Sequence, residues 1–335
     1  MKILFVSPRY NEVGGVEYVV RSLAERLVEK FEVEIMTGGD RIAEYESNGI
    51  KVYEHPTFSP NNAYHIPLKR GELVERLKSI LREVDVVHVH NFHSVFSVWI
   101  GKKAKEIADI KLIATGHYHS TGHSTVRKVL WIPWKRYLKR FLERVDKIHT
   151  ISQLEKERIL KDFPSSKDKL VLIPNGVDED VFRYEWRGEN SDYMMYAGRI
   201  EKYKRIEKAI EVAKELNLRI LIVGSGSYKS TLVDYSKRIY SNVEFLKPLP
   251  RDEYLKLLSN TRYAINPSER EAFGLFTAEA MAIGVPVIGS IEVAKAIGAE
   301  LKEKIGDLFL LDRIRVKSWS EVVKEYMEKL YAFKS

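Results

Sequence analysis

The chain has 335 residues, of which 44% are hydrophobic, and it carries a formal net charge of +8. This length exceeds what one hydrophobic core usually serves, so we expect two domains. The absence of cysteine excludes disulfides, thiolate nucleophiles and cysteine metal sites, and no run approaches the roughly 20 apolar residues that cross a bilayer. We therefore expect a cytoplasmic protein, and its 30% of charged residues is typical of thermophiles. The positive charge favours phosphates, nucleic acid or an acidic membrane face as partners.

Short apolar runs alternate with amphipathic segments in the first half of the chain. The strands that we expect there are 3–7, 33–37, 84–90, 112–115, 147–151 and 170–173. Between them, apolar residues repeat with the 3.6-residue period of a helix, as in Val19, Val20, Leu23 and Leu27. Nearly all-apolar strands that alternate with helices predict a parallel sheet covered on both faces.

A second alternating series follows the turn signal Pro174-Asn175-Gly176. Its expected strands are 193–197, 219–223, 243–246, 263–266 and 285–288, with helices around 205–216 and 253–259 and a closing helix over 319–333. The predicted fold class is therefore α/β, with two Rossmann-like, doubly wound parallel-sheet domains facing a cleft. We place these domains at 1–174 and 175–316, and a C-terminal helix that packs back on the first domain at 317–335.

Residues 266–290 carry the strongest motif. Gly274 permits a close approach of the backbone, and a helix is expected to begin near Leu275, where free N–H groups can bind a phosphate. Glu271 precedes this helix and Glu279 lies inside it, so one carboxylate can accept hydrogen bonds from sugar hydroxyls and the other from a ribose. Taken singly, Glu271 also fits a solvated loop charge and Glu279 a partner of the helix dipole. Their joint placement around the glycine favours a ligand site.

The segment 196–205 also lies between an expected strand and an expected helix, and it is basic. A ligand with two adjacent phosphates needs fixed cations, which arginine and lysine supply. Cations fit the start of a helix poorly, because the helix dipole is positive there. This misfit favours a bound anion over a solvated face, although Lys202 and Arg205 fit surface charges.

Two further patterns leave alternatives open. Gly224-Ser225-Gly226 follows a strand, but the third glycine of a dinucleotide fingerprint would fall at Lys229, which disfavours NAD. His88 and His90 lie on one face of a strand and, with His117, form in principle a zinc site. Paired histidines also fit a polar cleft wall, and no supporting carboxylate motif is apparent. We therefore expect neither a metal nor a cofactor.

The motif at 266–290 resembles the signature of the group 1, or family 4, retaining glycosyltransferases, in which two glutamates separated by seven residues enclose Phe-Gly. The resemblance spans the chain and implies the GT-B architecture. It also implies a nucleotide-diphosphate sugar donor that is held mainly by the second domain, an acceptor on the side of the first domain, and no essential metal.

The resemblance further implies roles for charged residues of the second domain. Glu271 would contact the donor sugar, and Glu279 would bind the donor ribose. Arg199, which follows Gly198, and Lys204 would clamp the diphosphate.

Other roles implied by the resemblance fall on backbone groups and on one histidine. The backbone from Phe273 to Leu275 would lie beside the sugar and the diphosphate, and Gly224 would lie on the cleft rim. In the first domain, Gly15 of the Gly14-Gly15 turn would approach the donor phosphate. His117, in Thr115-Gly116-His117, would lie near the donor sugar.

The match thins after Ser290, where family members continue with a Gly-Gly-x-x-Glu loop and this chain enters a helix-like pattern at 291–295. This departure leaves donor closure and sugar choice open. We expect a retaining glycosyltransferase whose acceptor, lipid-linked or saccharide, the sequence does not identify. A nucleotide-sugar 2-epimerase and a non-catalytic sugar-nucleotide binding protein are the alternatives. No motif for nucleic-acid binding is present.

The segment 126–144 is both basic and aromatic. Its cations include Lys135, Arg136, Lys139 and Arg140, and its aromatic residues are Trp131, Trp134, Tyr137 and Phe141. This combination suits an interfacial helix on acidic lipid, so peripheral contact with the inner membrane face is an expectation. In the alternative, Leu130, Leu138 and Leu142 fit a helix packed on the first domain's sheet, with the charges on its solvated side.

Overall fold

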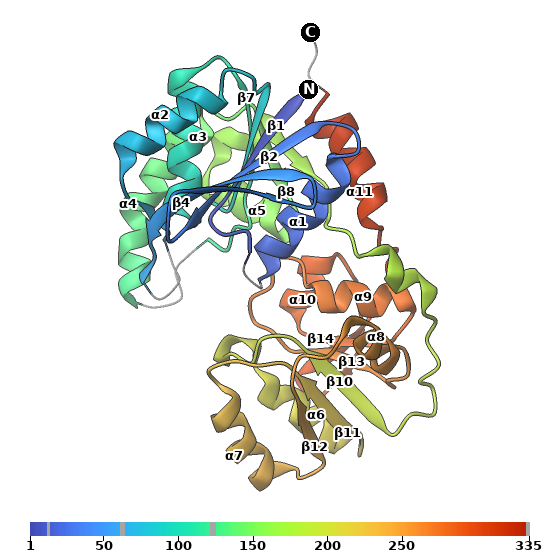
Figure 1. Ribbon diagram of the computed structural model, residues 1–335. Coiled ribbons are helices and arrows are strands. Elements are labelled where there is room, and N and C mark those ends of the chain that lie inside the picture. Colours follow the sequence, from blue (N-terminus) through green and yellow to red (C-terminus); the bar gives the residue numbers. More distant parts are fainter. Residues whose placement is uncertain (12–13, 61–63, 121–124, 333–335) are drawn as a thin grey trace. The chain divides into compact units, whose positions relative to one another are not determined.

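The computed structural model describes residues 1–11, 14–60, 64–120 and 125–332. The chain divides into two compact units, one comprising Met1–Pro174 with Trp319–Ser335 and the other Asn175–Ser318. Each unit is an α/β structure built on its own sheet (Figure 1). The predicted α/β class with two doubly wound parallel sheets is confirmed.

The sheet of the first unit is parallel from its centre to one edge. Its strands are β1 (Lys2–Ser7), β2 (Glu32–Gly39), β3 (Ala43–Ser47), β4 (Ile50–Phe58), β5 (Ile66–Pro67), β6 (Val86–His90), β7 (Lys111–Thr115), β8 (Lys147–Thr150) and β9 (Leu170–Leu172). In the described residues the order is β3-β4-β2-β1-β6-β7-β8-β9, with β5 against β4. Only β3 and β5 are antiparallel to their neighbour. Sequence reasoning missed β3, β4 and β5, because β3 is a half-exposed edge strand and polar residues interrupt β4.

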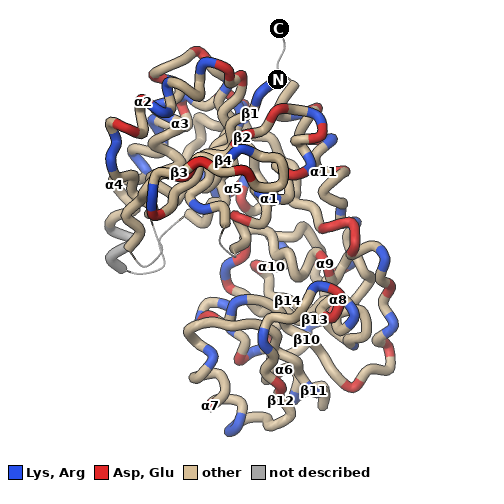
Figure 2. The backbone as a smooth tube through the Cα atoms, in the orientation of Figure 1, with Lys and Arg blue, Asp and Glu red and all other residues tan. Residues whose placement is uncertain are grey.

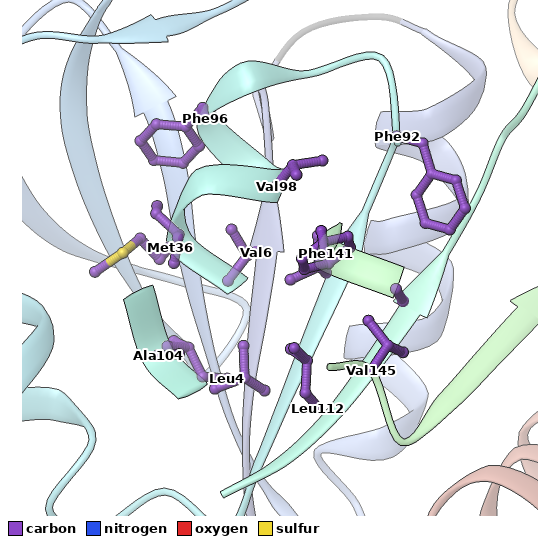
Figure 3. Packing of buried hydrophobic residues seen from close by; sticks show 14 of the residues in the cluster. Leu4, Val6, Met36, Phe92, Phe96, Val98, Ala104, Leu112, Phe141 and Val145 are labelled. Carbon is purple, nitrogen blue, oxygen red and sulfur yellow. The ribbon is translucent and has the colours of Figure 1, made fainter. Parts of the chain in front are cut away.

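Helices cover both faces of this sheet. They are α1 (Gly15–Leu27), α2 (Arg70–Ile80), α3 (Val95–Ile107), α4 (Thr125–Leu142), α5 (Gln153–Asp162), the 3-10 helix η2 (Pro164–Lys169), α11 (Trp319–Glu325) and the π-helix η5 (Tyr326–Leu330). Alternate residues of β1 enter different cores, since Leu4 and Val6 pack with α3 and α4 (Figure 3) while Ile3 and Phe5 pack with α1 and α11. This alternation is the period of a strand buried on both faces.

The C-terminal segment belongs to the core of the first unit. Trp319, Val322 and Tyr326 are buried against α1 and the sheet, and the Trp319 indole N–H donates to the Tyr18 hydroxyl at 3.2 Å. The closing helix that the sequence predicts is therefore α11 followed by the π-turns of η5, and residues 333–335 lie outside the described part. None of the helices in the described residues is long and apolar enough to span a bilayer.

The helix α4 packs its aromatic side chains inward, which corrects the expectation of an interfacial aromatic belt. Trp131 and Phe141 are buried in the core, and Trp134 donates from its indole N–H to the Phe92 carbonyl at 2.9 Å. Pro133 lies inside the helix without ending it. In the alternative interpretation Leu130, Leu138 and Leu142 pack on the sheet; Leu138 and Leu142 are buried, whereas Leu130 is 52% exposed. The side chains of residues 125–129 lie outside the described part.

The second unit has a seven-stranded sheet in the order β12-β11-β10-β13-β14-β16-β15. Its strands are β10 (Tyr193–Ala197), β11 (Arg219–Val223), β12 (Val243–Leu246), β13 (Ala264–Asn266), β14 (Val287–Gly289), β15 (Leu301–Ile305) and β16 (Leu308–Leu311). Its helices are η3 (Glu179–Arg183), η4 (Lys202–Lys204), α6 (Ile206–Glu215), α7 (Lys229–Ile239), α8 (Arg251–Ser259), α9 (Leu275–Ile283) and α10 (Ile291–Ile297), of which η3 and η4 are 3-10 helices. The antiparallel hairpin of β15 and β16 was not predicted, because β15 is largely exposed and polar.

A buried polar network ties the C-terminal segment to the first sheet. The two imidazoles of His88 and His149 flank the Thr115 hydroxyl, with N···O distances of 2.8 and 3.0 Å. The Tyr331 hydroxyl lies 2.7 Å from His88, and the Tyr326 hydroxyl lies 3.0 Å from His149. All five side chains are buried. Their mutual hydrogen bonds therefore replace the hydrogen bonds to water that these groups lose on folding.

Burial keeps the histidines of this region neutral. It lowers the pKa of His149 to about 4 and that of His117 to about 3, and it holds the pKa values of His88 and His90 well below the ordinary value. In the unfolded chain each titrates near 6.5, so stability is lost as the pH falls from 6.5 toward the folded-state values. Glu155 has the opposite effect on stability, because burial raises its pKa to about 7. Its contribution to the free energy of unfolding is lost as the pH rises from about 4.5 through 7.

We predict that the first unit loses stability on acidification from pH 7.5 to 5.5. Each buried neutral histidine is expected to lower the free energy of unfolding by about 1.4 kcal/mol per pH unit below 6.5. Urea unfolding is followed by tryptophan fluorescence in a Trp186→Phe background, in which the four remaining tryptophans all lie in the first unit.

Two variants test the assignment of this slope. His149→Gln is expected to flatten the pH dependence, whereas Glu155→Gln is expected to steepen it, because Glu155 offsets one histidine. A free energy of unfolding that does not change with pH, or a change of slope in the same direction in both variants, contradicts the account.

Candidate active site

The strand order of the second sheet reverses between β10 and β13, and two loops leave the sheet there. The loop 198–205 follows β10 and the loop 267–274 follows β13, and these two strands are parallel neighbours. The backbone N–H of Glu269 donates to the Tyr203 carbonyl at 3.1 Å, which joins the loops. In open parallel sheets, ligands bind at such a reversal, beyond the carboxyl ends of the strands.

Lys204 and Glu271, predicted on separate motifs, form an ion pair across these two loops. Their side chains retain only 15% and 13% of their exposure. The pair therefore places one cation and one carboxylate together beyond the carboxyl ends of β10 and β13. Arg205 and Glu269 form a second ion pair between the same loops at 2.7 Å, but these side chains are more exposed. Arg205 thus has a structural partner, in keeping with its interpretation as a surface charge.

Arg199 projects from the same loop with an exposed guanidinium. Its Nη2 donates to the Tyr203 hydroxyl at 2.7 Å, and its carbonyl accepts from the Tyr196 hydroxyl at 2.9 Å. Gly198 before it has a φ of +151°, a conformation that residues with a Cβ rarely adopt. The loop therefore has a fixed backbone and a cation that faces solvent.

Gly224 and Gly226 have a packing role that is sufficient to explain the glycines. A Cβ at Gly224 would lie 1.9 Å from the Gly198 carbonyl oxygen, and one at Gly226 would lie 2.1 Å from that of Ile200. The loop after β11, which contains Ser225, is hydrogen-bonded to the loop 198–205, since the Ile200 N–H donates to the Ser225 carbonyl at 2.8 Å. The Gly-x-Gly pattern thus supports the loop that carries Arg199.

The helix α9 begins at Leu275, where the sequence predicts it. Gly274 precedes it with a φ of +87° and, as a glycine, gives the first turn no side-chain cap. The N–H groups of that turn carry the positive end of the helix dipole, which favours an anion. Phe273 is buried beside them and fixes the approach of the loop to the helix.

Glu279 lies in the second turn of α9 and is 8% exposed. Arg251 and Tyr254 of α8 donate to its two carboxylate oxygens, each at 2.5 Å. Burial raises the pKa of Glu279, while Arg251 and Tyr254 oppose that shift. No local pattern pointed to these partners, because they lie on another helix, 28 and 25 residues before Glu279.

The first unit holds the other two predicted residues, Gly15 and His117. Gly15 is the first residue of α1, and a Cβ there would meet no atom of the described residues within 4 Å, so packing against that part of the chain does not require glycine. His117 follows β7 with a φ of +46° and is 6% exposed. Its Nε2 has no hydrogen-bond partner among the described residues. With a pKa of about 3, His117 offers a neutral ring.

Glu155, which sequence reasoning missed, holds the loop of His117. It accepts hydrogen bonds from the N–H groups of Tyr118 and Ile151 at 2.6 and 2.7 Å. The zinc alternative for His88, His90 and His117 finds no support, since the described residues contain no group of three or more His, Asp or Glu side chains arranged to hold a metal ion.

Comparisons with known proteins identify the family of the chain. The family model described as Glycosyltransferase Family 4 matches residues 13–181, and that described as Glycosyl transferases group 1 matches residues 178–329. The Methanocaldococcus jannaschii glycosyltransferase MJ1607 is 28% identical over 320 residues, which cover 87% of this chain and 80% of the relative. D-inositol 3-phosphate glycosyltransferase of Paenarthrobacter aurescens is 23% identical over 321 residues, which cover 84% of this chain and 78% of the relative.

A solved structure shares the fold over nearly the whole chain. The crystal structure of Anabaena HepE in complex with UDP and glucose matches with a TM-score of 0.70 at 18% identity, and the match covers 99% of this chain and 91% of that one. Together, the two family models span almost the entire sequence. The chain therefore belongs to the family 4, group 1 glycosyltransferases of GT-B fold and is an enzyme of the glycosyltransferase class.

Proposed function

We propose that the enzyme transfers a sugar from a nucleotide-diphosphate sugar, with retention at the anomeric carbon, to a lipid-linked or saccharide acceptor. The observation that carries this proposal is that Lys204 and Glu271 form an ion pair beyond the carboxyl ends of β10 and β13, in the loops that include the approach to the start of α9. A diphosphate needs a cation and N–H donors, and a sugar needs a carboxylate that accepts from its hydroxyls. The complex of HepE with UDP and glucose is in keeping with such a donor.

The proposed reaction breaks the bond between the anomeric carbon and the diphosphate oxygen, and forms a bond from that carbon to an acceptor oxygen. Charge develops on the leaving diphosphate, where Arg199, Lys204 and the N–H groups of α9 supply electrostatic stabilisation. The acceptor attacks from the face of the leaving group, so its proton passes to a leaving phosphate oxygen. This scheme needs no separate protein base. His117, with its neutral ring, is assigned a hydrogen bond to the donor sugar.

The first test identifies the donor and the reaction. A thermal-shift screen against nucleotides and nucleotide sugars is expected to show stabilisation by one nucleoside diphosphate and its sugar, because a ligand that binds the folded state raises its stability. Mass analysis with the stabilising donor and a panel of acceptors is expected to show a product heavier by one sugar. An isomer formed from the donor alone indicates an epimerase instead, and binding without any product indicates a binding protein.

Glu271 offers a matched pair of variants for the same assay. Glu271→Gln is expected to lower turnover more than nucleoside diphosphate affinity, because the contact is assigned to the sugar. Glu269→Gln, in the same loop, is the control and is expected to retain turnover. Equal turnover in both variants removes Glu271 from the site.

Another prediction concerns the diphosphate clamp. Arg199→Ala is expected to weaken nucleoside diphosphate binding about 10- to 100-fold, because a hydrogen bond to a charged group contributes about 1.5–3 kcal/mol. It is expected to leave binding of the bare nucleoside unchanged. Calorimetry measures both affinities, with Arg205→Ala as the control, since Arg205 lies in the same loop and pairs with Glu269. Equal weakening for diphosphate and nucleoside contradicts the clamp.

We also propose peripheral contact of the first unit with an anionic membrane surface through α4. Its outer face combines the exposed Leu130 and Ile132 with the exposed cations Arg136, Lys139 and Arg140. Ile132, Arg136 and Arg140 follow one another at intervals of four residues and therefore share one helix face. Lys135 is set aside, because it pairs with Asp162 at 2.7 Å. Elsewhere, cations and acids are interspersed along both units (Figure 2).

Co-sedimentation with vesicles tests this contact. Wild type is expected to bind anionic vesicles at low salt and to release them at high salt. The triple variant Arg136→Gln, Lys139→Gln, Arg140→Gln is expected to bind about 100-fold more weakly, since each cation near such a surface contributes about 1 kcal/mol. The control neutralises Lys214, Lys237 and Arg238, which are exposed cations of the second unit. Binding that ignores lipid charge, or an equal loss in both triple variants, contradicts the proposal.

A further inference from the structure

Both oxygens of the buried Glu279 carboxylate are held by side chains of α8. Arg251 donates from Nη1 to Oε1 and Tyr254 donates from its hydroxyl to Oε2, each at 2.5 Å. Arg251 and Tyr254 are three residues apart on one helix, so both side chains project from the same face. Two donors on two different oxygens fix the plane of the carboxylate, which a single ion pair would leave free to turn.

Arg251 is itself immobilised by a second carboxylate. Its Nε and Nη2 donate to the two oxygens of Asp180 at 2.9 and 3.1 Å, which is the bidentate geometry that guanidinium and carboxylate favour. Asp180 lies in η3, and its pKa is lowered mainly by this hydrogen bond. The guanidinium is thus clamped on one side by Asp180 and presents its remaining edge to Glu279.

The held carboxylate keeps acceptor capacity for a ligand. Each carboxylate oxygen has two lone-pair sites, and the structure gives each Glu279 oxygen one donor from α8. Two adjacent hydroxyls of a ribose suit the remaining sites, one on each oxygen. An ionised carboxylate is needed for this, because it accepts without donating, and Arg251 and Tyr254 both favour the ionised form.

The position of Glu279 on α9 also suits a nucleotide. Glu279 is four residues after Leu275, so the two share a helix face and lie about 6 Å apart along the axis. A diphosphate at the uncapped start of α9 and a ribose at Glu279 therefore fall on one side of one helix. That spacing matches two adjoining parts of a single nucleoside diphosphate.

We propose that Arg251 and Tyr254 are positioning residues that orient the Glu279 carboxylate toward the 2′- and 3′-hydroxyls of the donor ribose, with Asp180 holding Arg251 in place. This inference rests on the proposed nucleotide-sugar function. It adds a layer of residues that act on the ligand only through Glu279.

The test compares two probes that differ only at the ribose. Calorimetry measures the affinity for the nucleoside diphosphate found in the donor screen and for its 2′,3′-dideoxy counterpart. Tyr254→Phe, which keeps the ring, is expected to weaken binding of the ribonucleotide about 3- to 10-fold and that of the dideoxynucleotide less than twofold. Arg251→Gln is expected to reduce the preference for the ribonucleotide over the dideoxynucleotide more than Tyr254→Phe does. Asp180→Asn is expected to reduce the same preference less than Arg251→Gln does.

A matched control separates positioning from general stability. Tyr235→Phe removes the same kind of contact elsewhere in the unit, since the Tyr235 hydroxyl donates to Glu211 at 2.7 Å, and it is expected to change neither affinity. If Tyr254→Phe and Arg251→Gln weaken both probes equally, or neither, the inference is overturned while the function stands. If wild type binds no nucleoside diphosphate, the proposed function fails and the inference fails with it.

Discussion

The ion pair between Lys204 and Glu271 depends on the reversal of strand order between β10 and β13. Because of this reversal, the loops after the two strands both leave the sheet at the carboxyl ends of neighbouring strands. Both side chains are mostly removed from solvent, and a charge left alone in such a place is costly, whereas a paired one is tolerated. A ligand that draws Lys204 away must therefore also give Glu271 a hydrogen-bond donor. In the proposed function, a diphosphate joined to a sugar supplies both, because its phosphates offer an anion to Lys204 and its hydroxyls offer donors to Glu271.

The residues around this pair are fixed by backbone packing more than by side chains. The carbonyl groups of Gly198 and Ile200 lie where a Cβ at Gly224 or Gly226 would stand, so the loops after β10 and β11 pack against each other directly. Backbone hydrogen bonds from Gly198 to Val223 and from Ile200 to Ser225 continue the parallel pairing beyond the strands. A cation carried by such a loop keeps its place before a ligand arrives, which is the condition for electrostatic stabilisation without reorganisation.

The sequence predicted what depends on local pattern and missed what depends on distant partners. Most of the apolar strands and the start of α9 at Leu275 followed from periodicity and from local turn and capping signals. The edge strands β3 and β15 were not predicted, because exposed edge strands contain few apolar residues in a recognisable pattern. The aromatic residues of α4 look alike in sequence whether they face lipid or core, and only the packing against the sheet decides that Trp131 and Phe141 turn inward. No pattern could pair Glu279 with Arg251, since a loop, a strand and a further loop separate them.

The two units divide the candidate chemistry by charge. Every ionic group that we assign to the donor lies in the second unit, whereas the two residues that we assign in the first unit, Gly15 and His117, bring no charge, because burial keeps His117 neutral. A ring with a pKa of about 3 is a weak base near neutral pH, and it holds no proton to give as an imidazolium. Its remaining ability is to donate or accept one hydrogen bond without adding charge. In the mechanism that we propose, the leaving phosphate accepts the acceptor's proton, and a weakly basic His117 would not compete with the phosphate for that proton.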